Sequence, residues 1–125
     1  MTSPRTPDAR READSRGREG EAEAAMFLTQ IGWRIVAERV KTKAGEIDLV
    51  AKRTGLVAFV EVKWRARAAS LADAIDERRL TRVAAAAESV MHLYATEGED
   101  IRIDVILLAP GRKPTHIENA WMPFG

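Results

Sequence analysis

Residues 46–53 and 56–64 constrain the fold of this chain more than any other feature. The two segments, EIDLVAKR and LVAFVEVKW, are rich in Val, Ile, Leu and Phe, and only Thr54-Gly55 separates them. Such runs are typical of strands, and glycine at the second position of a two-residue turn suits the positive φ that tight hairpins require. The sequence therefore predicts a β-hairpin whose short turn also sets the register of the two strands.

This register places four ionisable residues together. Asp48 would lie directly across from Glu61, and Glu46 directly across from Lys63. All four share one strand parity, so their side chains would point to the same face of the hairpin. Ionisable groups in apolar strands are costly to bury unless something pairs with them. The hairpin is therefore the first place to look for a functional site.

Two carboxylates facing each other raise one another's pKa or require a cation between them. Mg²⁺ (or Mn²⁺) held by Asp48 and Glu61 would meet that need, because Mg²⁺ binds one or two carboxylates and keeps several waters. Such a metal polarises a phosphodiester and lowers the pKa of a bound water, while Lys63 would orient that water or neutralise developing charge. The alternative is a solvated cross-strand charge ladder. The residues alone leave both interpretations open.

The rest of the chain adds helices to this hairpin. Residues 1–18 are almost without apolar side chains and predict a disordered tail, so that 19–125 form a single domain. From Gly20 an apolar stripe at helical spacing predicts a helix that ends at Gly32. The stripe consists of Ala24, Phe27, Leu28 and Ile31.

Four further elements are expected. Residues 33–41 alternate as a regular strand, and a long helix with an apolar stripe lies within 76–95. A buried strand follows at 101–109, and 115–124 supply an edge strand. The order α-β-β-β-α-β, with an optional last strand, predicts an α/β fold of the α+β kind, in which helices pack on a mixed sheet.

Composition excludes several classes of protein. The chain has 125 residues, no cysteine and a net charge of +1. There are consequently no disulfides, thiolate zinc sites or cysteine nucleophiles, which fits a cytoplasmic protein. No apolar run is long enough for a membrane span, and the N-terminus lacks the apolar core of a secretory signal. A nucleic-acid binder with so small a net charge must gather its positive charge on one face.

Basic residues surround the hairpin in the sequence and are candidates for that face. They are Arg65, Arg67, Arg78, Arg79 and Arg82, together with Arg39, Lys41 and Lys43 at the end of the first strand. If they converge, they would hold a phosphate backbone over the carboxylates. Because acidic residues are interspersed, ordinary solubilising charge is an equal alternative. The low aromatic content of 6% disfavours a stacking platform for single strands and favours duplex or branched substrates.

Three sequence segments together resemble a known family. They are the helix opening GREGEAEAAMFL (17–28), the motif GEID (45–48) and the motif VEVK (60–63). These segments resemble the YraN-like uncharacterised bacterial family. That family is similar in fold to the restriction-endonuclease-like PD-(D/E)xK nuclease superfamily and to archaeal Holliday-junction resolvases. The resemblance extends from about residue 17 to residue 121 and implies the αβββαβ core of those nucleases.

The resemblance also implies roles for individual residues. Asp48 and Glu61 would take the two acidic positions of the motif and bind metal, and Lys63 would be its lysine. In resolvase-like members a glutamate of the first helix joins the metal site, and Glu21 falls on that position. Read without the resemblance, Glu21 is better explained as a first-turn glutamate that favours the helix dipole.

The chain departs from the superfamily pattern at two places. Glu46-Ile47 precedes Asp48 where the superfamily's name has proline, and Arg78-Arg79 stands in the region where the second helix usually presents a lysine. Arginine favours bidentate phosphate contacts over proton transfer, which indicates binding rather than catalysis there.

Two functions are consistent with these residues. The first is Mg²⁺-dependent endonucleolytic hydrolysis of DNA, for which branched or duplex forms are favoured, with RNA as the less favoured substrate. The second is a non-catalytic nucleic-acid-binding or scaffold module on the same fold, since fold alone does not establish cleavage. The small size of the chain also favours a homodimer that enlarges the binding surface.

Overall fold

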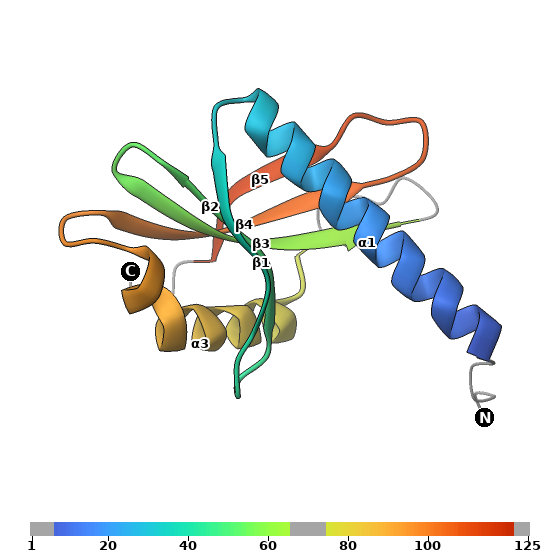
Figure 1. Cartoon of the computed structure of the whole chain (residues 1–125), viewed down its shortest axis with the longest axis horizontal. Helices are drawn as coiled ribbons and strands as arrows, with labels where there is room; N and C mark the ends of the chain where they lie inside the picture. Colours follow the sequence, from blue (N-terminus) through green and yellow to red (C-terminus); the bar gives the residue numbers. More distant parts are fainter. Residues whose placement is uncertain (1–6, 66–74, 122–125) are drawn as a thin grey trace.

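In the described part of the chain, a five-stranded mixed sheet lies at the centre and carries one helix on each face (Figure 1). The structure, a computed structural model, describes residues 7–65 and 75–121, and side chains from residue 18 onward. The strands are β1 (Arg34–Lys41), β2 (Glu46–Arg53), β3 (Leu56–Trp64), β4 (Asp100–Leu108) and β5 (Thr115–Trp121), and the helices are α1 (Pro7–Gln30) and α3 (Glu77–Tyr94). The α+β mixed-sheet architecture expected from the sequence is confirmed.

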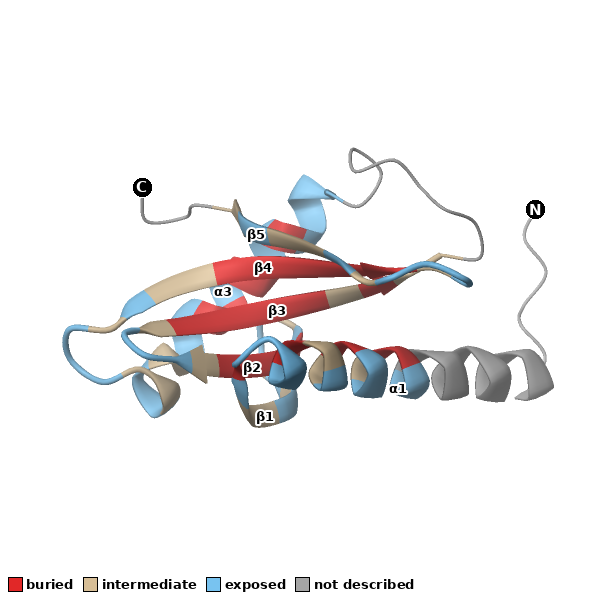
Figure 2. Ribbon diagram, turned by 90° about the horizontal axis from the view of Figure 1, so that it is seen from above, coloured by how far each residue is buried: buried red, intermediate tan, exposed pale blue. Residues whose placement is uncertain are grey.

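The strands lie in the order β1-β2-β3-β4-β5. Successive strands are antiparallel except β3 and β4, which are parallel. A parallel pair needs a crossover connection, and α3 lies in the connection between β3 and β4. β3 is thus a central strand, covered by α1 on one side and α3 on the other, and it is buried along nearly its whole length (Figure 2).

The predicted hairpin register is confirmed where β2 and β3 pair. Arg53 lies opposite Leu56, and the pairing continues to Leu49 opposite Val60. Gly55 has a φ of 76°, the left-handed conformation expected for the turn. Beyond that pairing, the Asp48 carboxylate accepts the backbone N–H of Val62 at 2.8 Å. A side chain from β2 therefore bonds the β3 backbone at the end where the functional residues lie.

Two hydrophobic clusters hold the helices to the sheet. Ala24 and Leu28 of α1 are buried in the cluster on one face, and Leu80 and Val83 of α3 are buried in the cluster on the other. The helix periodicity was therefore predictive, with one exception. Ile31 is 44% exposed because α1 ends at Gln30 and the chain turns away from the sheet before this residue.

α1 begins earlier than the sequence indicated. Its first residue is Pro7, inside the segment 1–18 for which a disordered tail was expected. The segment contains two alanines, five arginines and one glutamate, which have high helix propensity and extend a helix without an apolar stripe. The division into a tail and a domain stays a prediction. Among the described helices, none has the length and apolar character needed to cross a membrane.

β1 is less regular than its alternating sequence predicted. The pairing of β1 with β2 shifts between Ile35 and Ala37, which is a β-bulge. Farther along, Arg39 has a φ of 51°, in the left-handed region that non-glycine residues rarely adopt. The strict alternation is broken, since Val36 and Ala37 both pack against the cluster beneath α3. The direction of the side chains at the end of β1 is thus set by the tertiary structure.

A candidate metal centre and its basic surroundings

Charged side chains are rarely buried unless they are paired, and the described part of the chain buries four. Asp48, Glu61 and Lys63 are 9%, 1% and 7% exposed, and Asp104 is fully buried. The first three belong to the ends of β2 and β3, and the fourth to β4. Because burying three charged side chains in one place costs free energy, this end of the hairpin is the candidate site.

Asp48 is the most perturbed carboxylate of the site. Burial and repulsion from Glu61 raise the pKa of Asp48 from 3.8 to about 7, although the hydrogen bond from the Val62 N–H opposes the rise. Glu21 repels the Asp48 carboxylate further, whereas Arg79 attracts it. A carboxylate with these surroundings is short of positive charge, and a cation beside it would offset the repulsion.

The Glu61 carboxylate forms an ion pair with a cationic side chain of α3. Its Oε1 accepts a hydrogen bond from Nε of Arg79. Burial nevertheless raises the pKa of Glu61, with Arg79 as the main opposing influence. Asp76 caps the N-terminus of α3 by accepting the Arg79 N–H at 3.3 Å. The first turn of α3 therefore positions the Arg79 side chain over Glu61.

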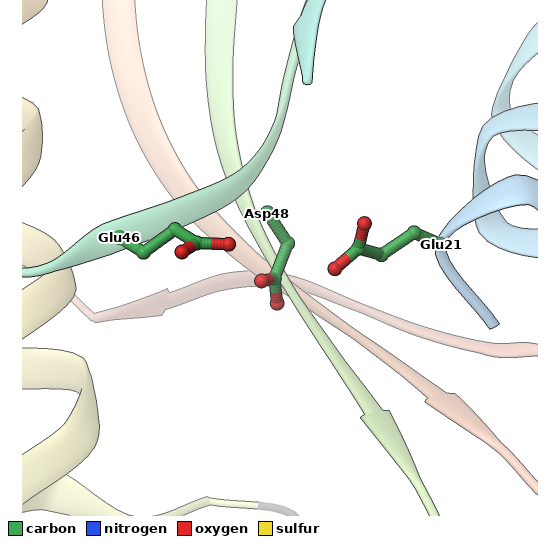
Figure 3. Close-up of side chains that lie close together, drawn as sticks. All are labelled: Glu21, Glu46 and Asp48. Atoms are coloured by element: carbon green, nitrogen blue, oxygen red, sulfur yellow. The ribbon is translucent and has the colours of Figure 1, made fainter. Parts of the chain in front are cut away.

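Asp48 and two further carboxylates lie close enough to hold one metal ion. Oxygen atoms of Glu21, Glu46 and Asp48 all lie within 4.8 Å of one another. Figure 3 shows Glu46 and Asp48 of β2 and Glu21 of α1 directing their carboxylates toward a common point. The three oxygen donors match the preference of Mg²⁺ and Mn²⁺ for hard ligands. The donor set thus fits the divalent metal expected from the sequence.

This cluster differs from the predicted metal ligands in one member. The structure brings the predicted residues Glu21 and Asp48 together, but Glu46 completes the group in place of Glu61. The extended register predicted that Glu46 pairs with Lys63 across the hairpin, but this pair is not formed. Glu46 lies at the start of β2, opposite Lys41 of β1, where β2 and β3 are no longer paired. Its shared parity with Asp48 was the signal that could have identified it.

Lys63 lies beside Glu61 in a small open pocket. The pocket has a volume of about 200 Å³. It is lined by Glu61, Val62, Lys63, Trp64, Arg65, Asp76 and Arg79. Burial lowers the pKa of Lys63, while Asp76 and then Glu61 oppose this effect. An ammonium with a lowered pKa and neighbouring carboxylates is suited to hydrogen-bond a water molecule or an anionic oxygen.

The predicted basic residues are distributed around this end of the sheet. Arg65 and Arg79 line the pocket, and Arg78 and Arg82 are exposed on α3. Arg82 lies near the turn before β2, since a Cβ added to Gly45 would be 3.9 Å from the Cβ of Arg82. Lys43 is exposed in the same turn, and Arg67 lies outside the described residues. Arg79 differs from the expectation of a free phosphate ligand, because it is paired with Glu61.

Arg39 takes a position that the sequence did not reveal. Its Nε donates to Oε2 of Glu21 at 2.7 Å. The sequence placed Arg39 only among the basic residues at the end of the first strand. The contact joins residues 18 positions apart and depends on the left-handed backbone of β1, so no local pattern announces it.

The fold has a counterpart among solved structures. The structure of Archaeoglobus fulgidus Hjc, a Holliday junction resolvase, matches with a TM-score of 0.54 and 17% sequence identity. The match covers 78% of this chain and 72% of that chain. At this identity the similarity shows a shared fold, which confirms the restriction-endonuclease-like core expected from the sequence.

Relatives in sequence cover almost the whole chain. A UPF0102 protein of Erythrobacter litoralis is 66% identical over 89% of this chain and 96% of its own length. A UPF0102 protein of Sphingopyxis alaskensis is 55% identical, with the same coverage of both chains. The model of uncharacterised protein family UPF0102 matches residues 20–108, from the start of the predicted domain to the end of β4. The chain therefore belongs to the uncharacterised protein family UPF0102.

Proposed function

We propose that this protein is a Mg²⁺-dependent endonuclease that hydrolyses phosphodiester bonds in DNA, in a branched or duplex form. One observation carries the proposal: Asp48, Glu61 and Lys63 are buried together at one end of the hairpin, and Glu61 and Lys63 line a pocket open to solvent. Strongly perturbed ionisable groups at such a place are typical of an active site rather than of structural packing.

The carboxylates of the site are the ligands for the metal in this proposal. Asp48, Glu21 and Glu46 would hold it, because their oxygens already converge. The Glu61 carboxylate is close enough to repel that of Asp48. Glu61 would therefore contribute a further ligand from the other side of the site. A bound Mg²⁺ would polarise the phosphodiester and lower the pKa of a water ligand.

Lys63 has a separate role in the proposal. Its ammonium can donate three hydrogen bonds, and it lies in the pocket with Glu61. From there it would orient the attacking water and neutralise the charge that develops on the phosphate. The lowered pKa of Lys63, caused first by burial, brings it closer to the range in which it can exchange a proton.

DNA is the proposed substrate because the surroundings suit a phosphate backbone. Arg65 lines the pocket with Glu61 and Lys63, Arg82 lies near the turn that precedes β2, and Arg78 and Lys43 are exposed. Guanidinium groups bind phosphates bidentately. The similarity in fold to a Holliday junction resolvase supports a branched DNA substrate. The cytoplasmic location, the preference for DNA over RNA and a homodimer stay predictions.

A non-catalytic function has one observation in its favour. The Arg79 guanidinium already neutralises Glu61, so this carboxylate is engaged within the protein. A nucleic-acid-binding or scaffold module could retain such a pair without needing a metal. Cleavage measurements separate the two functions, because only the nuclease requires the Lys63 ammonium.

Replacing Lys63 by methionine is expected to reduce Mg²⁺- or Mn²⁺-dependent cleavage by about 10²- to 10³-fold. Methionine keeps an unbranched apolar stem in the buried site but removes the ammonium. Cleavage of labelled four-way junctions, duplexes and single strands by the wild-type and variant proteins provides the measurement. The metal affinity of the variant should stay close to that of the wild type, since Lys63 is not a ligand.

Lys52→Met is the matched control for this substitution. Lys52 is also partly buried in the hairpin, but its ammonium contacts Glu99 and the Tyr94 carbonyl away from the site. Its variant should therefore cleave at the wild-type rate at a temperature where it is folded. The nuclease proposal fails if the wild type cleaves none of the substrates, or if Lys63→Met cleaves as fast as the wild type.

A further inference from the structure

Arg39 keeps a backbone conformation that arginine disfavours. Its φ of 51° lies in the left-handed region, where the Cβ of an L-residue meets the following carbonyl. Among the described residues other than glycine, Asn119 alone shares this property, and asparagine tolerates it through local hydrogen bonds. A strained arginine in a strand indicates that its side chain is needed where the strain places it.

The strained backbone places Arg39 at the acidic cluster. Glu38 pairs with Leu49 and Val40 pairs with Ile47, so Arg39 lies across from Asp48 in the β1–β2 ladder. Its guanidinium donates to Glu21 at 2.7 Å. Glu46 and Asp48 attract the same guanidinium, although less strongly than Glu21. Arg39 therefore faces all three carboxylates that could bind a metal.

The charges explain why a cation is needed there. Three carboxylates converge within 4.8 Å, and they repel each other in the absence of a metal. Arg39 supplies a single positive charge to this group, where Mg²⁺ would supply two. Its side chain is 42% exposed, so the guanidinium can leave the cluster without opening the hydrophobic core.

We propose that Arg39 is the counter-ion of the empty metal site and a phosphate ligand of the loaded one. Without metal, its guanidinium neutralises Glu21 and keeps this carboxylate in the cluster. When a divalent ion takes Glu21, the guanidinium is released toward solvent and binds a DNA phosphate. The inference rests on the proposed function, since it assumes that the acidic cluster binds metal and that the substrate is DNA.

A purely structural role for Arg39 has different consequences. If the Glu21 contact served only to fasten α1 to β1, removing it would lower the melting temperature and leave ligand binding unchanged. Arg39→Gly separates the two roles, because glycine adopts the left-handed conformation without strain. The variant removes the charge while the backbone of β1 keeps its bend.

The first measurement is Mn²⁺ binding to the DNA-free protein by titration calorimetry. Arg39→Gly should bind Mn²⁺ about two- to fivefold more tightly than the wild type, because the metal no longer displaces a cation from Glu21. Its melting temperature in EDTA should change little, because glycine removes the left-handed strain and thereby offsets the loss of a partly exposed ion pair. Arg39→Lys should restore most of the wild-type affinity, since it returns the charge, and Asn119→Gly should leave Mn²⁺ affinity unchanged.

The second measurement is the salt dependence of DNA binding in the presence of Mn²⁺. It uses the Lys63→Met background, which is expected to bind DNA without cleaving it efficiently. Each lost phosphate contact lowers the slope of log affinity against log salt concentration by about 0.9. Arg39→Gly should show this reduction, and Arg34→Ala, which removes an exposed arginine at the other end of β1, should not.

Unchanged Mn²⁺ affinity of Arg39→Gly, or an unchanged salt slope, would overturn the inference while the wild-type protein still bound metal and cleaved DNA. A lower melting temperature with no change in either binding measurement would identify Arg39 as a structural tether. If the wild type itself bound no Mn²⁺, the proposed nuclease function would fail, and the inference would fail with it.

Discussion

Asp48→Asn is expected to make the metal-free protein more stable at pH 8 and to abolish metal-dependent cleavage. Folding raises the pKa of Asp48 from 3.8 to about 7, so the ionised carboxylate opposes folding. At 1.36 kcal/mol per pKa unit, removing this charge is worth up to about 4 kcal/mol. The asparagine carbonyl can still accept the Val62 N–H, so the hydrogen bond across the hairpin is kept.

The pH dependence follows from the sign of the shift. Below pH 4 Asp48 is protonated in both the folded and the unfolded states, and the penalty is absent. Between pH 4 and 7 the unfolded chain loses its proton first, so the folded state loses stability as pH rises. Above pH 7 the penalty is complete. The stability difference between Asp48→Asn and the wild type should therefore grow from pH 4 to 7 and then level off.

Urea unfolding in EDTA at several pH values measures this difference. Glu46→Gln is the control, because Glu46 belongs to the same cluster but is exposed and should gain little stability. Both variants should weaken Mn²⁺ binding, since each removes a proposed ligand. A destabilised Asp48→Asn protein at pH 8 would contradict the interpretation that Asp48 is kept for function at a cost in stability.

The second large effect is expected on the opposite edge of the sheet. Asp104 of β4 is fully buried and accepts four hydrogen bonds: two from Arg102, one from His116 and one from the Asn119 N–H. Burial opposes ionisation, but the hydrogen bonds from His116 and Arg102 outweigh it and lower the pKa of Asp104. Asp104→Ala should reduce the free energy of unfolding by about 3–5 kcal/mol, because it leaves these groups buried without their partner.

Urea unfolding at pH 7 checks this prediction. Asp104→Asn should lose less stability than Asp104→Ala, because the amide oxygen still accepts one or two of the hydrogen bonds. Glu118→Ala is the surface control, since Glu118 lies 3.6 Å from Arg102 with 56% of its side chain exposed, and its loss should cost under about 1 kcal/mol. Equal stabilities of Asp104→Ala and Glu118→Ala would contradict the interpretation that the buried hydrogen bonds of Asp104 stabilise the fold.

The Asp104 network shows where sequence reasoning stops. Nothing in the pattern of residues 101–109 distinguishes Asp104 from an aspartate on a solvated face of a strand. Arg102 lies two residues away on the same strand, but the other partners, His116 and Asn119, come from β5, whose pairing with β4 shifts between Ile103 and Val105. A β-bulge of this kind redirects side chains without leaving a mark in hydrophobic periodicity.

The residues of the candidate site were likewise predicted from the sequence only in part. Asp48, Glu61 and Lys63 were predicted from the sequence, because a two-residue turn and a side-chain period of two determine which residues of a hairpin approach one another. The family motif identified the same three residues. Their burial in the structure and the resulting pKa shifts then gave a physical reason to regard them as an active site.

The sequence by itself determined the order of helices and strands, and the hairpin register from the turn as far as Leu49 and Val60. It also identified Asp48, Glu61 and Lys63 as candidates for one site. Those features depend on local turn chemistry and on the periodicity of neighbouring residues. Only the tertiary structure decided that Glu46 joins Glu21 and Asp48, that Arg79 pairs with Glu61, and that Arg39 faces the acidic cluster. These contacts join distant segments through the packing of α1 and α3 and a left-handed residue in β1, none of which has a local signature.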